Sequence, residues 1–307
     1  MATTLVGRGQ GRARRPGSRL RWRNTIIGWS FILPNFIGFA ALTLVPLLAL
    51  GYVAFTDWNA FGVANWVGLE NFQQIVRDRS FRVALFNTAY YTVLHIPLTL
   101  AVSLGLALLL NQKLRGVAFF RTAAFFPYVT SIVAIAVVWN MLFSPEVGPL
   151  NQVLRAIGLS HPPGWTASAD WSMPAVIIVG TWREMGYYML LFLAGLQTIP
   201  RELHEAARVD GASAWQRFRH VTVPGLRTTT FFVVVVLTSG SFKVFDLILV
   251  MTDGGPGQST LVLSQYIYQK GFVENQLGYA SSVSVVFFLI CISVTLVQFA
   301  MNKRRES

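Results

Sequence analysis

The stretch Leu98-Thr-Leu-Ala-Val-Ser-Leu-Gly-Leu-Ala-Leu-Leu-Leu110 contains no charged residue and is apolar on every side of a helix. The stretch Phe231-Phe-Val-Val-Val-Val-Leu237 has the same character. A membrane β-barrel would instead show segments of about ten residues in which apolar and polar side chains alternate. These two stretches therefore predict helices that cross a membrane, each of which needs about 20 mainly apolar residues.

Six windows of the sequence meet this length requirement and together take up roughly half of the chain. They are residues 26–55, 86–110, 123–143, 173–199, 229–251 and 280–301. We expect an all-α integral membrane protein with a basic arm over 1–25, six transmembrane helices over 26–301 and a basic tail over 302–307. The first window is far longer than the 7 to 15 apolar residues of a cleaved signal peptide, so we interpret it as an uncleaved helix.

The overall composition agrees with a membrane protein. Of the 307 residues, 53% are hydrophobic and only 12% are charged, against roughly 25% charged in a soluble domain. Low charge also excludes a disordered chain, and a single cysteine, Cys291, excludes a disulfide scaffold. A net charge of +12 would suggest nucleic acid in a soluble protein, but we expect no nucleic-acid partner here because the basic residues gather beside the spans.

The basic residues are distributed unevenly between the two sides of the membrane. Seven lie in the arm, three between the second and third windows, five between the fourth and fifth, and three at the C-terminus. The alternate loops hold only five. Lys and Arg near the spans stay on the cytoplasmic side, so both termini are expected in the cytoplasm, which requires an even number of spans.

The loop over 200–224 carries strong helical signals of its own on the expected cytoplasmic side. Asp210 and Gly211 break the first helix, because glycine adopts the left-handed conformation at a helix C-terminus. Asp210 can then cap the helix that follows. That second helix is expected over 212–221 and is ended by Pro224. The loop is therefore predicted to form an elbow of two short helices.

The residues of this elbow favour contact with another protein. Ala206, Ala207 and Ala212 carry only a methyl group, so a partner can approach closely, while Glu205 and Arg208 offer charges at the rim. The alternative is a solvated helical hairpin with a single Glu205–Arg208 pair, worth about 0.2–0.5 kcal/mol.

At these positions the sequence resembles a known family. Glu205-Ala206-Ala207, Asp210-Gly211-Ala212, Phe218 and Pro224 resemble the EAA motif of inner-membrane permease subunits of binding-protein-dependent ABC importers. Four further stretches are similar to the carbohydrate branch, the permeases of maltose and glycerol-phosphate importers. They are Thr56-Asp57-Trp58-Asn59, Val67-Gly68-Leu69-Glu70-Asn71-Phe72, Phe125-Phe126-Pro127 and Met251-Thr252-Asp253-Gly254-Gly255-Pro256.

The resemblance implies a type I ABC importer permease fold in a bacterial-type inner membrane. It implies a second permease subunit, two ATPase subunits, an external solute-binding protein and a carbohydrate-like solute as partners. It also identifies a coupling helix that docks in a groove of the ATPase, formed by Glu205, Ala206, Ala207, Arg208, Asp210, Gly211 and Ala212. No phosphate-binding G-x-x-x-x-G-K-[ST] loop occurs in the chain, so we expect no enzyme activity and no cofactor here, with ATP and Mg on the partners.

Four charged residues fall inside the expected spans: Arg183, Glu184, Lys243 and Asp246. Each costs at least about 2.5–3.5 kcal/mol at mid-bilayer unless it is paired or hydrated. Lys243 and Asp246, three residues apart, would share one helix face, and Glu184–Lys243 and Arg183–Asp246 pairs would neutralise all four charges.

Two interpretations of these charges stay open. They are structural ion pairs, or they line a solute path and bind sugar hydroxyls. In the second case, nearby aromatic side chains would stack on the solute. These are Trp182, Tyr187, Tyr188, Phe242 and Phe245.

The expected outer loops cover residues 56–85, 144–172 and 252–279. The first contains an amphipathic pattern typical of an interfacial helix. Glycine and proline clusters in the other two indicate turns. These loops are either simple connections or docking sites for an external partner.

Other functions find less support in the residues. An ion-coupled secondary transporter without an ATPase is the main alternative, although such proteins often carry inverted repeats and no convincing repeat is found here. A hydrolase needs a nucleophile and a base within reach of each other, and none is indicated. The four histidines have no metal-ligand spacing.

Overall fold

The structure, a computed structural model, describes residues 18–112 and 115–303. Within these ranges the regular elements are helices, with one isolated β-bridge between Thr56 and Trp66 and no strand. Most of the expected basic arm over 1–25 and of the tail over 302–307 lies outside the described residues. The chain divides into two compact units, 1–52 and 53–307.

The first unit is built from one long helical segment. It consists of α1 (Ser18–Phe39), a π-helical turn η1 (Ala40–Leu44) and α2 (Val45–Val53). The helix continues past Pro46, and the π-helical turn directly precedes that proline, where a bulge accommodates the missing backbone N–H. The stretch Trp29–Val53 is long and apolar enough to cross a membrane, as the first window predicts.

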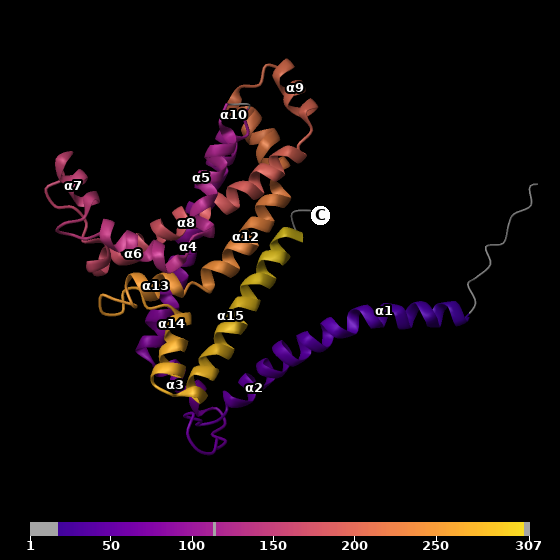
Figure 1. The fold of residues 1–307 in the computed structure, drawn as a ribbon, viewed down its shortest axis with the longest axis vertical. Coiled ribbons are helices and arrows are strands. Elements are labelled where there is room, and N and C mark those ends of the chain that lie inside the picture. The colour runs from indigo at the N-terminus through magenta and orange to yellow at the C-terminus, as the bar shows by residue number, and fades with distance from the viewer. Residues whose placement is uncertain (1–17, 113–114, 304–307) are drawn as a thin grey trace, which may run out of the picture. The chain divides into compact units, whose positions relative to one another are not determined.

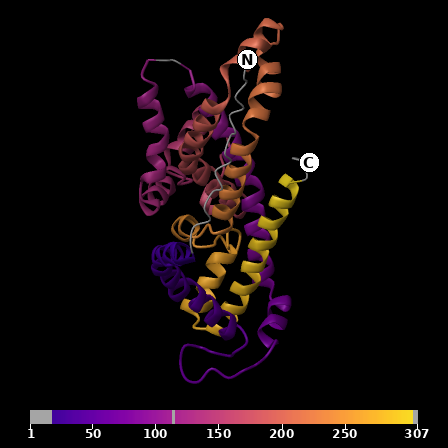
Figure 2. The same ribbon diagram turned by 90° about the vertical axis from the view of Figure 1, so that its right-hand side faces the viewer.

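The second unit contains the remaining elements, named in chain order. They are α3 (Glu70–Arg77), α4 (Arg79–Leu110), α5 (Val117–Val129), α6 (Ile132–Leu142), α7 (Pro149–Ala156), η2 (Trp165–Ala167), α8 (Ala169–Thr198), α9 (Arg201–Val209), α10 (Ala214–Arg217), η3 (Phe218–Thr222), α11 (Val223–Gly225), α12 (Arg227–Phe242), α13 (Asp246–Met251), α14 (Leu263–Tyr268), η4 (Gln269–Val273) and α15 (Leu277–Lys303). In this unit α9 and α10 lie at one end, and α3 lies at the other end beside the turn from α14 to α15 (Figures 1 and 2).

By length and composition, four segments of the described chain can cross a membrane: Trp29–Val53, α4, α8 and α15. Two further helix pairs pass the same test together but are bent, α5 with α6 and Ala214–Gly225 with α12. Counting each bent pair as one span raises the number to six. Four of the expected windows therefore correspond to continuous spans, and the window over 123–143 corresponds to the bent pair of α5 and α6. The window over 229–251 shares only α12 with the second pair, whose other part lies mostly in the loop over 200–224.

The expected helix over 123–143 is bent, because α5 and α6 meet at an angle of 99°. Pro127 removes a backbone donor from the last turns of α5. Thr130 is extended (φ −77°, ψ 149°), and its hydroxyl donates to the Phe126 carbonyl at 2.9 Å. Hydropathy is continuous across the bend, so the apolar pattern gives no sign of it.

The expected helix over 229–251 is present but is interrupted in its second half. The chain leaves the helical conformation after Phe242 and re-enters it at Asp246. Non-helical backbone at membrane depth is tolerated only where its polar groups are satisfied inside the protein. Here the Val244 carbonyl accepts a hydrogen bond from the Ser264 hydroxyl at 2.5 Å.

Helix α8 is at the centre of the second unit and packs against α4, α5, α12 and α13. In its apolar window 56% of the residues are buried, against 6% in α15, so α15 leaves most of its surface for lipid or partners. Close packing depends on Gly186, since a Cβ there would lie 1.9 Å from the Ala124 carbonyl oxygen on α5.

Four asparagine side chains connect separate segments of the second unit. Each does so through a side-chain amide that donates to two backbone carbonyls. Asn71 binds the carbonyls of Ala54 and Thr56, Asn87 those of Gln258 and Leu261, Asn140 those of Val250 and Met251, and Asn151 those of Pro145 and Pro163, at 2.8–3.4 Å. Buried carbonyls need such partners. These amides therefore order the loop backbone without regular secondary structure.

The stretches 56–59 and 67–72, which both belong to the family resemblance, are hydrogen-bonded to each other, and the first is also bonded to the start of α15. Asn71 donates to the Thr56 carbonyl at 2.8 Å, and the Trp58 carbonyl accepts from the Gly278 N–H at 2.8 Å. A Cβ at Gly278 would lie 2.0 Å from the Thr56 carbonyl oxygen, so a larger residue does not fit. These contacts therefore attach the start of α15 to the loop before α3.

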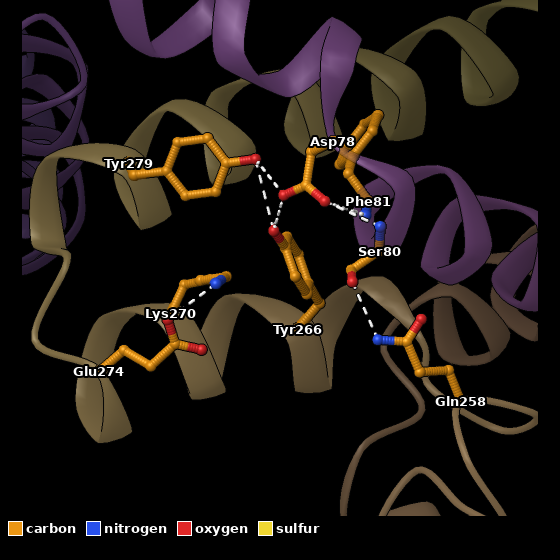
Figure 3. Close-up of polar contacts among 8 residues, drawn as sticks. All are labelled: Asp78, Ser80, Phe81, Gln258, Tyr266, Lys270, Glu274 and Tyr279. Atoms are coloured by element: carbon orange, nitrogen blue, oxygen red, sulfur yellow. Dashed lines mark hydrogen bonds and ion pairs between the residues drawn. The ribbon is translucent and has the colours of Figure 1, made fainter.

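Asp78 joins three helices at the same end of the unit (Figure 3). It caps α4 by accepting from the backbone N–H groups of Ser80 and Phe81. The hydroxyls of Tyr266 on α14 and Tyr279 on α15 also donate to its carboxylate. Burial raises the pKa of Asp78, but these hydrogen bonds together lower that pKa below its usual value.

Candidate functional site

A cavity of about 190 Å³ lies between α4, α8 and the break that separates α12 from α13. Its wall includes Arg183, Glu184, Lys243 and Asp246. All four charges expected inside the spans therefore face one space. The break in the fifth span is what makes this possible, because it turns the backbone of residues 243–246 into the cavity wall.

The ion pairs differ from those expected. Arg183 Nη1 lies 3.6 Å from Glu184 Oε1, and His95 Nε2 lies 3.9 Å from Glu184 Oε2. The expected Glu184–Lys243 and Arg183–Asp246 pairs do not form among the described residues. Neighbours on α8 neutralise each other instead, since their side chains reach along the same helix without crossing to α12.

Lys243 and Asp246 do not share a helix face, because Lys243 caps the end of α12 and Asp246 begins α13. Both side chains are exposed in this chain, and neither takes part in an ion pair within the described ranges. Unpaired charges at this depth are too costly to face lipid. This side of the cavity must therefore face water or another protein.

His95 forms the buried end of the cavity and is only 1% exposed. Its Nδ1 lies 3.0 Å from Ser241 Oγ, and its ring stacks on Tyr91 at 4.8 Å. A Cβ at Gly180 would lie 2.6 Å from the Tyr91 hydroxyl and 3.3 Å from His95 Nε2, so glycine is needed for α4 to approach α8 here. Among the described residues the buried His95 Nε2 has no hydrogen-bond partner, so a polar group in the cavity can bind it.

Only some of the expected aromatic residues reach this cavity. Phe245 lines it together with Tyr91. Tyr187 instead stacks on Tyr128 at 4.5 Å, and Tyr188 is buried in an apolar cluster. Trp182 and Phe242 do not line the cavity either. No group of three or more His, Cys, Asp or Glu side chains in the part of the chain that the structure describes could hold a metal ion.

The elbow over 200–224 has the expected break. The first helix, α9, ends at Val209, and Gly211 adopts the left-handed conformation with φ +78°. The Gly211 N–H donates to the Arg208 carbonyl at 3.1 Å, and the Ala212 N–H donates to the Ala207 carbonyl at 2.9 Å. The bend is therefore held by backbone hydrogen bonds as well as by the glycine.

Two details of the elbow differ from the expectation. Ser213, and not Asp210, caps the second helix: Ser213 Oγ accepts from the Gln216 N–H, and Gln216 Oε1 accepts from the Ser213 N–H at 2.7 Å. A serine at this position with glutamine three residues later is a capping box. Pro224 does not end the helix, because the chain stays helical through η3 and α11 and turns only at Leu226.

The elbow exposes an apolar surface. Leu203, Val209 and Trp215 are 52%, 87% and 66% exposed, while Glu205 and Ala206 are also exposed. No Glu205–Arg208 ion pair forms among the described residues. These exposures and the absence of the intrahelical pair favour a docked elbow over a solvated hairpin.

Comparison with known proteins decides the family. Residues 97–307 match the binding-protein-dependent transport system inner membrane component family. The chain belongs to this family. The match includes the elbow and all the elements that line the cavity except the start of α4.

The permease is similar to proteins named for ABC transport along nearly its whole length. It is 35% identical over 285 residues to the probable ABC transporter permease protein YurN of Bacillus subtilis, covering 92% of this chain and 97% of the relative. It is 34% identical over 294 residues to the lactose transport system permease protein LacF of Rhizobium radiobacter, covering 94% and 98%.

The fold of the permease is similar to that of a solved chain from a bacterial ABC transporter involved in the import of the acidic polysaccharide alginate. The TM-score is 0.82 at 25% identity, covering 94% of this chain and 99% of that chain. The expected ABC importer permease fold and transport role are confirmed, in preference to an ion-coupled transporter. The roles of the individual elbow and cavity residues stay predictions.

Proposed function

We propose that this permease forms one half of the path by which an ATP-driven importer carries a sugar or sugar-like polar solute. The observation that supports this proposal is the cavity wall at Lys243 and Asp246. Two exposed, unpaired charges at membrane depth require an aqueous space or a polar partner surface beside them. A path between this chain and a second permease subunit provides both.

The chemistry of the cavity suits a carbohydrate. His95, Ser241 and Glu184 can donate to or accept from hydroxyl groups, and Tyr91 and Phe245 offer aromatic faces for the apolar C–H patches of a sugar ring. Solute sites in transporters commonly lie where a span is broken near the bilayer midplane. The relative named for lactose and the structural neighbour named for alginate transport the same class of solute.

The elbow is proposed to couple this path to the ATPase subunits. Glu205, Ala206 and Ala207 lie on α9, which is exposed and stiff, because alanine is a strong helix former. An exposed helix held at a fixed bend transmits movement to the spans on either side of it, α8 before the elbow and α12 after it. Both of these spans line the cavity.

We propose the remaining parts of the importer on the basis of the family and the charge distribution. Two ATPase subunits supply ATP and Mg, and an external binding protein delivers the solute. The positive-inside rule places the elbow and both termini in the cytoplasm. This makes the chain a multi-pass inner-membrane protein whose outer loops face the binding protein.

The experiment that tests the proposed path is sugar uptake by proteoliposomes that contain the complete importer. Ser241→Ala removes the His95 partner in the cavity and is expected to raise the KM for uptake. Thr99→Val is the matched control, because Thr99 is equally buried and pairs with Thr181 at 3.1 Å outside the cavity lining. Equal changes in KM for the two variants would contradict the proposal.

A further inference from the structure

An apolar groove lies between the first half of α12 and the last turns of α15. The two helices are joined by a hydrogen bond from Gln298 Nε2 to Thr238 Oγ1 at 2.7 Å. Toward the start of α12 and the end of α15 a cavity of about 560 Å³ separates them. Phe231, Val234 and Met301 contribute to its walls, so most of the surface that it offers is hydrocarbon.

The position of the groove in the membrane follows from its walls. Both α12 and α15 belong to candidate spans, so the groove lies at the depth of one leaflet. Arg227 begins α12 and lines the groove, and Lys303 ends α15 directly after Asn302, which also lines it. Both side chains are exposed. The positive-inside rule places this end on the cytoplasmic side.

The groove is complementary to a lipid with a negative headgroup. Its walls suit acyl chains, and the cations at its mouth lie where phosphate groups of the bilayer are found. No Asp or Glu is among the residues that line it. Basic pockets between transmembrane helices on the cytoplasmic side bind anionic headgroups.

We propose that this groove binds an anionic phospholipid of the cytoplasmic leaflet, with its acyl chains between α12 and α15 and its phosphate at Arg227. Val223 and Pro224, the last part of the elbow segment, line the same groove. A bound lipid therefore contacts both sides of the bend at Leu226, where the elbow segment meets α12 at an angle of 66°, and stabilises that bend. Lipid occupancy would then influence how elbow movement reaches the cavity.

The test is native mass spectrometry of the purified importer titrated with phosphatidylglycerol or phosphatidylcholine of identical acyl chains. Arg227→Gln is expected to weaken phosphatidylglycerol binding about fivefold, the effect of one basic contact worth about 1 kcal/mol. Arg219→Gln is the matched control, because Arg219 is an exposed arginine of the same segment that does not line the groove. Binding of phosphatidylcholine should be the same in all three proteins.

Four results would overturn the proposal. The first is equal affinity of the wild-type importer for both lipids, and the second is an equal effect of the two arginine variants. The third is a cross-link from a Met301→Cys variant to another protein segment in place of lipid, made in a Cys291→Ser background. Inorganic phosphate in place of phosphatidylglycerol is expected to leave the mass and melting temperature unchanged, and stabilisation by phosphate alone would also contradict a lipid site.

Discussion

The cavity and the elbow differ in how they are built and in how much of their surface is exposed. The cavity gathers polar groups from α4, α8 and the α12–α13 break into a mostly buried space, with partners as far apart in sequence as His95 and Ser241. The elbow takes its shape from one short segment and leaves its apolar side chains exposed. The cavity is therefore built from distant parts of the chain and is open on the side of Lys243 and Asp246. The elbow is built locally and is exposed for contact with a partner.

The largest expected effect comes from breaking the elbow. Gly211→Pro forces φ to about −65° at a residue with φ +78° and removes the N–H that donates to Arg208. Uptake by reconstituted importer should fall to background, while insertion of the chain into the membrane is retained. Glu205→Lys, which reverses the charge on the exposed face of α9, should act in the same direction.

A matched glycine tests whether that effect is specific. Gly158 also has a positive φ (+98°), and its N–H donates to Arg155 at 3.0 Å, but it follows α7 and is far from the elbow in sequence. Gly158→Pro should leave uptake well above background. A similar loss in both variants would mean that proline at any such turn damages the fold.

The second effect concerns the charges of the cavity. Arg183→Gln leaves the Glu184 carboxylate without its neighbouring cation at membrane depth, where an uncompensated charge costs about 2.5–3.5 kcal/mol. Uptake measured with the complete importer should fall by at least about tenfold, since about 1.4 kcal/mol corresponds to a factor of ten. Lys270→Gln breaks an ion pair outside the candidate spans, Lys270–Glu274 at 2.7 Å, and should change uptake little.

The third effect concerns the apolar surface of the elbow. Val209→Glu places a charge on a side chain that is 87% exposed, so the fold should tolerate it while docking of the elbow is weakened. ATPase activity stimulated by the binding protein should fall several-fold. Ile157→Glu, at a side chain that is 74% exposed after α7, is the control, and an equal fall in that variant would show that the elbow surface is not special.

The smallest effect on transport is expected at Asp78, which belongs to neither region. Asp78→Ala removes the carboxylate that accepts from the hydroxyls of Tyr266 and Tyr279, and only the 3.4 Å contact between the two hydroxyls is left. The expected cost is about 2–3 kcal/mol in the free energy of unfolding. The melting temperature should fall, while uptake at low temperature stays near the wild-type value. Lost uptake without lost stability would instead place Asp78 in the transport mechanism.

The same carboxylate predicts the direction of a pH effect. The pKa of Asp78 in the folded chain lies below its ordinary value of 3.8, so its contribution to stability is present at neutral pH. That contribution is lost as the pH falls from the ordinary value through the lowered one. Asp78→Asn should therefore lose less stability than wild type on acidification, and parallel curves for the two proteins would contradict this assignment.

The difference between the two regions also explains what could be predicted from the sequence. The elbow depends on local signals, Gly211 and the residues around it, and these predict its bend. Asp210 is the expected cap, but Ser213, three residues later, caps the second helix through a capping box with Gln216. The four intramembrane charges can be recognised from the sequence because a charge stands out in an apolar window.

The partners of those charges could not be predicted in the same way. The bend between α5 and α6 leaves the apolar pattern continuous, and the break after Phe242 depends on contacts distant in sequence, such as that of Ser264 with Val244. His95 and Ser241 meet only because α4 and α12 pack on the same central helix, which Gly180 permits. A single polar residue in an apolar stretch, such as His95 or Asn87, was the one available signal.

The most direct test of the account is whether the elbow controls access to the cavity. Lys243→Cys in a Cys291→Ser background places one thiol on the exposed cavity wall of the assembled importer. A membrane-impermeant maleimide added from outside should label it faster when a non-hydrolysable ATP analogue is bound, and Gly211→Pro should abolish that response. If labelling responds to the nucleotide equally with the elbow intact and with Gly211→Pro, the elbow does not transmit the movement and the account is wrong.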